Sequence, residues 1–133
     1  MTKKKVNQVA YEIVGCAIEV HKQVGPGLLE WVYEICLVQE LKVKGFQIVR
    51  QLSVPITYKG VRLDAELRLD LLVNDCVVVE LKAVENLIPL YEAQLLTYMK
   101  LLQKPKGLLI NFHTENITKS IKPMVNEFFS ILP

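Results

Sequence analysis

The spacing of apolar residues switches from a helical to a strand-like period near residue 46, and this switch constrains the fold more than any other feature. Upstream, apolar residues recur every three or four positions in two runs, separated by Gly25-Pro26-Gly27, a segment that ends a helix. Downstream, side chains alternate over several segments, as they do in half-buried strands. Helical spacing then returns, ahead of a short apolar run typical of a strand covered on both faces. We expect helices at 4–24, 28–44, 91–103 and 125–131 and strands at 46–49, 51–58, 63–73, 76–82, 108–112 and 117–121.

This order of elements predicts an α/β fold in which helices pack on a mixed sheet. The chain has 133 residues, of which 51% are hydrophobic, so it can fill one core and is not a disordered chain. We expect one domain over 1–133, with an N-terminal helix at 4–24, a core from about 25 to 122 and a short C-terminal helix.

Composition and targeting features predict a reduced, cytoplasmic protein. The N-terminal segment lacks the apolar stretch of a signal peptide, and no apolar run reaches the roughly 18 residues of a membrane helix. The cysteines have no Cys-x-x-Cys spacing, so neither a disulfide framework nor a thiolate zinc site is expected. A net charge of +2 neither requires nor excludes a nucleic-acid partner, since a nearly neutral protein can carry a basic patch.

The strands at 63–73 and 76–82 are expected to form a hairpin whose register decides where Asp70 points. A two-residue loop at Asn74-Asp75 would direct Asp70 and Glu80 to opposite faces, whereas a three-residue loop or one bulge would pair them. Any site that contains both carboxylates therefore requires an odd offset in this hairpin. Alternation places Leu63, Ala65, Leu67, Leu69 and Leu71 on one side of the first strand and Asp64, Glu66, Arg68 and Asp70 on the other.

Glu80 and Lys82 interrupt the end of a Val-rich strand, on one face of it. If Asp70 joins them, two convergent carboxylates repel each other and lose hydration, and a divalent cation relieves both costs. Oxygen ligands favour a hard ion, Mg²⁺ or Mn²⁺, over Zn²⁺. Such an ion can acidify a water and polarise a phosphoryl oxygen, while Lys82 could orient that water or stabilise charge on the phosphate. An exposed ion pair at a strand end and a structural ion site are the alternatives.

Several motifs together resemble one nuclease family. Asp70, followed after nine residues by Glu80-x-Lys82, is similar to the core of the PD-(D/E)xK nuclease superfamily. Gly27-Leu-Leu-Glu30-Trp-Val-Tyr33 resembles the GxxExxY signature that names one family within it. The resemblance implies a restriction-endonuclease-like αβββαβ core, with a central mixed sheet flanked by helices. It extends over about 24–112, through Val79–Glu85, Glu92–Tyr98 and Gly107–Phe112.

The resemblance also implies roles for individual residues. Asp70 and Glu80 would be metal ligands, and Lys82 would be the catalytic lysine. Glu30 would match a helical acidic residue that adds a metal or water ligand. From the residues alone, Glu30 near a helix N-terminus is equally explained by the helix dipole, and Tyr33 either holds Glu30 in place or belongs to the core.

Gln94 and Tyr98 match a Gln-x-x-x-Tyr element that some branches of the superfamily place near the site and the nucleic acid. Because they are four residues apart, they share one helix face. Without the surrounding motifs, a structural role for this pair is the simpler interpretation. We expect their face to be offset from the apolar stripe that packs on the sheet, formed by Leu95, Leu96, Met99 and Leu102.

Together these features predict a nuclease that depends on Mg²⁺ or Mn²⁺ and hydrolyses phosphodiester bonds of nucleic acid, with DNA as the expected substrate. One alternative is a non-catalytic nucleic-acid-binding or accessory protein that retains the fold. Another is a structural interaction protein with a surface ion pair. One small domain offers little surface for long nucleic acid, so a homodimer or a protein partner could supply more.

Overall fold

The computed structural model describes the backbone of residues 1–133 and every side chain except those of Asp64 and Glu66. Within this described part, none of the helices is long and apolar enough to cross a membrane. The elements in chain order are α1 (Lys3–Val24), α2 (Glu30–Val43), β1 (Ile48–Tyr58), β2 (Val61–Val73), β3 (Val77–Lys82), α3 (Pro89–Leu102), β4 (Lys106–Asn111), the 3-10 helix η1 (Ile117–Ser120), β5 (Ile121–Val125) and α4 (Glu127–Ser130).

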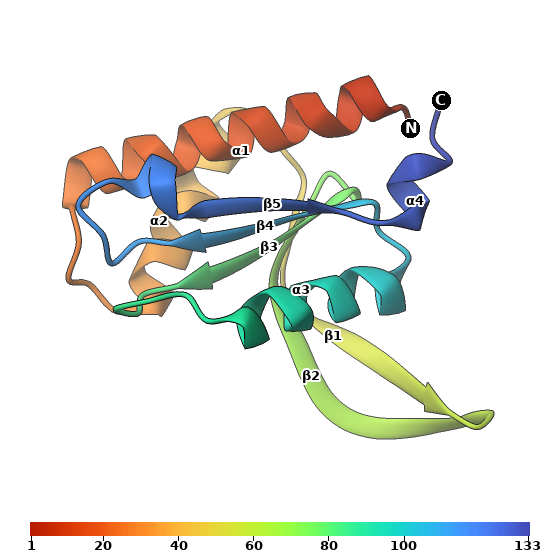
Figure 1. Cartoon of the computed structure of the whole chain (residues 1–133). Helices are drawn as coiled ribbons and strands as arrows, with labels where there is room; N and C mark the ends of the chain where they lie inside the picture. Colours follow the sequence, from red (N-terminus) through yellow and green to blue (C-terminus); the bar gives the residue numbers. More distant parts are fainter.

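The strands form one mixed sheet in the order β1-β2-β3-β4-β5 (Figure 1). Neighbouring strands are antiparallel except β3 and β4, which are parallel and are joined through α3. Two helices, α1 and α2, cover one face of the sheet and α3 covers the other. The predicted α/β fold, with a mixed sheet flanked by helices, is therefore confirmed.

Two apolar clusters hold these layers together. The larger joins α1 and α2 to the sheet face that carries Leu71, Val79 and Ile110. The smaller lies on the opposite face, where Leu95 and Met99 of α3 pack on the sheet. Burial of one such side chain contributes about 1.5–3 kcal/mol, so both helical layers are firmly fixed against the strands.

The β1–β2 hairpin changes its inward-facing side at Gln51 and Asp70, which the register places opposite each other. Gln51 has a left-handed backbone with φ 50°. On one side of this point Leu71 packs under α1 and α2, whereas on the other Leu52 and Leu69 pack under α3. The expectation that Leu69 and Leu71 share a side is wrong, because the alternation of β2 is interrupted at Asp70, opposite the left-handed Gln51 of β1. The side chains of Asp64 and Glu66, expected on the opposite side, lie outside those the structure describes.

The segment 117–131 also differs from expectation. The predicted strand at 117–121 is a 3-10 helix, and the last strand is β5, which pairs with β4. Pro123 within β5 lacks an N–H group and is tolerated because β5 is an edge strand. The terminal helix is shorter than predicted because β5 extends to Val125, and Asn126 then caps α4 by accepting from the Phe128 N–H at 3.1 Å.

Candidate functional site

Asp70 and Glu80 meet where β2 separates from β3. The pair Val73↔Val77 closes a three-residue loop over 74–76, so the odd offset that a shared site requires is present. Regular pairing ends at Leu71↔Val79. Beyond it, the Asp70 N–H donates to Oε1 of Glu80 at 3.0 Å, and the Leu81 N–H donates to Oδ2 of Asp70 at 2.8 Å. Beyond the last regular pair, the two carboxylates thus accept backbone hydrogen bonds in place of carbonyl groups, and these contacts hold the two side chains close to each other.

Ionisation of both carboxyl groups, Asp70 and Glu80, is unfavourable at this position. Glu80 is only 6% exposed, and burial together with the Asp70 charge raises its pKa to about 8. Burial also raises the pKa of Asp70, and the Glu34 carboxylate adds to that shift, while the Leu81 N–H opposes it. In the absence of a cation, the pair therefore retains a proton at neutral pH.

Lys82 lies two residues after Glu80 on the same strand, and its charge lowers the pKa of both Asp70 and Glu80. Its ammonium nitrogen is 4.4 Å from the centroid of the Tyr91 ring, at the start of α3. Among the described residues, Lys82 takes part in none of the ion pairs. The structure therefore places the lysine beside the carboxylates, resting on an aromatic face.

Glu30 is the first residue of α2 and is exposed to solvent. Although the residue as a whole is exposed, partial burial of its carboxyl group and the charge of Asp70 raise the pKa of Glu30, while the charge of Lys82 lowers it. Within the described part of the chain, however, no three acidic, cysteine or histidine side chains lie close enough to form a metal cluster. The structure brings Asp70 and Glu80 together as a pair and leaves Glu30 further out.

Tyr33 belongs to the core and anchors the loop that leads into α2. Its hydroxyl donates to the Gly25 carbonyl at 2.6 Å and accepts from the Leu28 N–H at 3.1 Å, and its ring stacks on Phe112 with centroids 4.5 Å apart. Gly27 in this loop has φ 100°, a conformation that favours glycine. Gly27 and Tyr33 of the GxxExxY pattern thus shape the loop that delivers Glu30.

We expect Tyr33→Phe to destabilise the protein by about 1–3 kcal/mol, because the Gly25 carbonyl and the Leu28 N–H lose their partner while the ring still packs. Urea denaturation followed by circular dichroism measures this loss. Tyr11→Phe, at a residue 74% exposed on α1, is the control and should change stability by less than about 0.5 kcal/mol. Equal stability of the two variants would contradict this role for Tyr33.

Gln94 and Tyr98 are joined on α3, where the Gln94 side-chain amide donates to the Tyr98 hydroxyl at 3.0 Å. Tyr98 is 5% exposed within the cluster under α3, and burial and the Glu80 charge raise its pKa. The predicted offset of this pair from the apolar stripe is wrong for Tyr98, which packs beside Leu95. Leu96, expected in the stripe, is 41% exposed instead.

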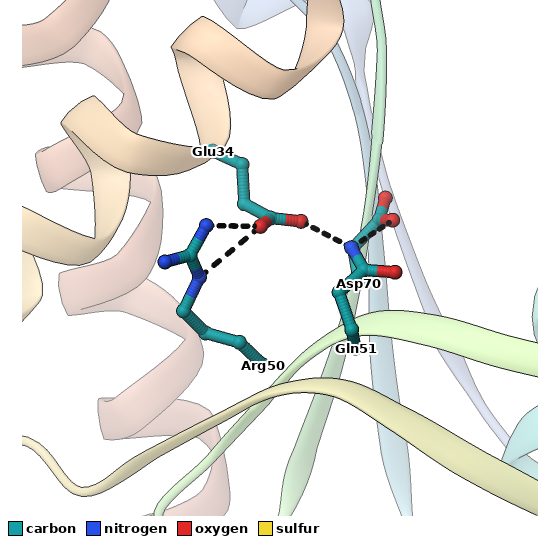
Figure 2. A network of polar contacts seen from close by, with 4 residues as sticks. All are labelled: Glu34, Arg50, Gln51 and Asp70. Atoms are coloured by element: carbon teal, nitrogen blue, oxygen red, sulfur yellow. Dashed lines mark hydrogen bonds and ion pairs between the residues drawn. The ribbon is translucent and has the colours of Figure 1, made fainter.

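A polar network that contacts Asp70 was not predicted from the sequence (Figure 2). Glu34, buried on α2, accepts from Arg50 at 2.7 and 3.1 Å and from the Gln51 side chain at 2.6 Å. The same Gln51 amide reaches Oδ1 of Asp70 at 3.4 Å. One signal was present: Glu34 is four residues after Glu30 and shares its helix face. The contacts that Arg50 and Gln51 of β1 make with Glu34 could not be predicted from the spacing of residues in the sequence.

A family model described as the PD-(D/E)XK nuclease superfamily matches residues 7–124. The chain belongs to this superfamily. No curated protein and no solved structure matches the chain at a significant level. PD-(D/E)XK nucleases generally use divalent metals.

The residues present here fit such an ion. Asp70 and Glu80 offer oxygen donors, which a hard divalent cation prefers. Each carboxylate spends one oxygen on a short backbone N–H contact, at 2.8–3.0 Å. Oε2 of Glu80 accepts no hydrogen bond from the described residues and is not among buried unpartnered atoms, so it is open to a ligand. A cation at this pair would also relieve the repulsion that raises both pKa values.

Proposed function

We propose that this chain is a GxxExxY-type nuclease that uses Mg²⁺ or Mn²⁺ to hydrolyse phosphodiester bonds, with DNA as its substrate. The observation that carries the proposal is the Asp70–Glu80 pair, joined by reciprocal backbone contacts where β2 leaves β3. Burying two carboxylates lowers the stability of the folded protein unless a bound ligand offsets the cost. The nuclease superfamily to which the chain belongs suggests that the reaction is phosphodiester hydrolysis.

Each polar side chain of the site takes a role in this proposal. Asp70 and Glu80 hold the cation, which when bound supplies Lewis acidity at a phosphoryl oxygen and a more acidic water. Glu30, at the start of α2, orients water beside the pair. The Lys82 ammonium donates to the attacking water or to the phosphate oxygen on which charge develops. Gln94 and Tyr98 are positioning residues on α3.

The proposal extends to the organisation and setting of the protein. Residues 1–133 act as one domain, and a second copy or a partner protein supplies additional surface for nucleic acid. The protein acts in the cytoplasm. Size-exclusion chromatography with light scattering, with and without DNA, tests whether two copies assemble.

A cleavage screen tests the activity. Purified protein is incubated with Mg²⁺ or Mn²⁺ and with plasmid, linear duplex, single-stranded, branched and RNA substrates. We expect cleavage that needs the metal and is lost in Glu80→Gln but retained in Glu85→Gln, a change on the exposed loop after β3. Binding of nucleic acid without any cleavage would favour the non-catalytic accessory protein instead.

Metal binding has its own expected result, because a ligand that binds the folded state raises the melting temperature. At a Mn²⁺ concentration of 100 times the dissociation constant, stabilisation is about 2.7 kcal/mol. Differential scanning fluorimetry at pH 8 should show the rise in the wild-type protein and not in Asp70→Asn. A surface ion pair without a metal site predicts equal curves with and without Mn²⁺.

A further inference from the structure

The Gln51 side chain bridges two carboxylates from different elements (Figure 2). Its amide nitrogen donates to Oε1 of Glu34 on α2 at 2.6 Å and reaches Oδ1 of Asp70 on β2 at 3.4 Å. A primary amide nitrogen has two N–H groups, and carboxylates accept but do not donate when ionised. Both N–H groups are therefore directed at acceptors, and the orientation of the amide is fixed by its neighbours.

Glu34 is itself fixed. Its side chain is 7% exposed, and Arg50 binds its Oε2 through two nitrogen atoms, at 2.7 and 3.1 Å. Arg50 forms an ion pair with this carboxylate through Oε2 and leaves Oε1 of Glu34 for Gln51. Arg50 and Gln51 are neighbours on β1, and both donate hydrogen bonds to the Glu34 side chain of α2.

The backbone conformation of Gln51 is also unusual for its residue type. Its φ of 50° lies in the left-handed region, which is uncommon for residues other than glycine and persists where surrounding contacts hold it. A glycine would adopt this conformation freely. The position instead carries a glutamine, and the left-handed turn directs its side chain across the ladder toward Asp70.

We propose that Gln51 is a positioning residue that fixes the Asp70 carboxylate for the cation, with Arg50 and Glu34 holding Gln51 in place. This inference rests on the proposed function. Asp70 is held at both oxygens, by the Leu81 N–H at 2.8 Å and by Gln51 at 3.4 Å. A ligand group fixed in advance loses less conformational freedom when the ion binds, so affinity rises without a new contact to the metal.

The direct test is a Mn²⁺ titration by calorimetry. Gln51→Gly removes the side chain and accepts the left-handed backbone, so the variant should fold. Loss of a group that orients a metal ligand weakens metal affinity by about 10–100-fold, and we expect a loss in that range. Lys59→Gly is the matched control, because Lys59 has φ 49° in the exposed turn at the far end of the hairpin. Gln51→Met, which keeps the side-chain length without N–H donors, should behave as Gln51→Gly does.

A second readout needs no metal. If Gln51 restrains Asp70, its loss frees Oδ2 of Asp70 from the Leu81 N–H, and hydrogen exchange at that amide accelerates. The amide of Val79, within the regular β2–β3 pairing, should exchange at its wild-type rate. If Gln51 had a purely structural role, its loss would accelerate hydrogen exchange at the Leu81 and Val79 amides alike.

The outcomes separate this inference from the proposed function. Wild-type binding of Mn²⁺ with unchanged affinity in Gln51→Gly and Gln51→Met would overturn the positioning role and leave the proposed function standing. Absence of Mn²⁺ binding by the wild-type protein would overturn both. Weaker Mn²⁺ binding by both Gln51 variants, together with faster exchange at the Leu81 amide and unchanged exchange at the Val79 amide, supports the inference.

Discussion

Lys82→Met protein should cleave nucleic acid about 10²- to 10³-fold more slowly than the wild type and still gain thermal stability from Mn²⁺. A positioned charge that stabilises developing negative charge contributes about this factor to the rate. Methionine keeps the length that packs on the Tyr91 ring, 4.4 Å from the ammonium group in the wild type, and removes the charge. Cleavage rates at saturating Mn²⁺, measured beside melting curves, separate catalysis from metal binding.

Lys100→Met, on the exposed surface of α3, is the matched control and should cleave at the wild-type rate. Glu80→Gln should lose both cleavage and the Mn²⁺-dependent stabilisation. If Lys82→Met retained activity within about threefold of the wild type, Lys82 would have no part in the reaction.

The second large effect is on stability. Without divalent metal at pH 8, Glu80→Gln protein should be more stable than the wild type by on the order of 2–4 kcal/mol, since one pKa unit corresponds to about 1.4 kcal/mol. Burial and the Asp70 charge raise the pKa of Glu80 from 4.5 to about 8. Between these values the folded protein holds a proton that the unfolded chain releases, so wild-type stability falls as the pH rises from about 4.5 to about 8.

Urea denaturation at pH 6 and pH 8 in the presence of a chelator measures this difference. The advantage of Glu80→Gln should be larger at pH 8, because at pH 6 the wild-type carboxyl is mostly protonated in the folded state. Glu85→Gln, at an exposed carboxylate, should follow the wild type at both values. A wild-type protein that is equally stable at pH 6 and pH 8, with no gain in Glu80→Gln, would show that Glu80 carries no such penalty.

Local patterns predicted most of the architecture because the core follows simple periods. The run of valines before Glu80 and the helical spacing of 91–103 correspond to β3 and α3 within two residues at each end. The positions of Asp70 and Glu80 in the sequence predicted that their side chains can meet only with an odd offset in the hairpin, and the Val73↔Val77 pair provides this offset. The sequence alone left two registers open, because both loop lengths suit Asn74-Asp75.

The network behind Asp70 could not be predicted for a different reason. It depends on the left-handed backbone of Gln51, and neither glycine nor asparagine marks that position in the sequence. Alternation in β2 is interrupted at Asp70, opposite Gln51, so Leu69 and Leu71 lie on different faces of the sheet. β5 was missed because Pro123 argues against a central strand and is compatible with an edge.

Anomalous diffraction at the manganese edge, from crystals grown with Mn²⁺, decides whether Asp70 and Glu80 together bind a metal ion. We expect one strong peak with an oxygen of Asp70 and an oxygen of Glu80 both at about 2.1–2.2 Å, as for a small hard cation. Well-ordered Asp70 and Glu80 side chains with no peak between them would contradict a metal site at this carboxylate pair.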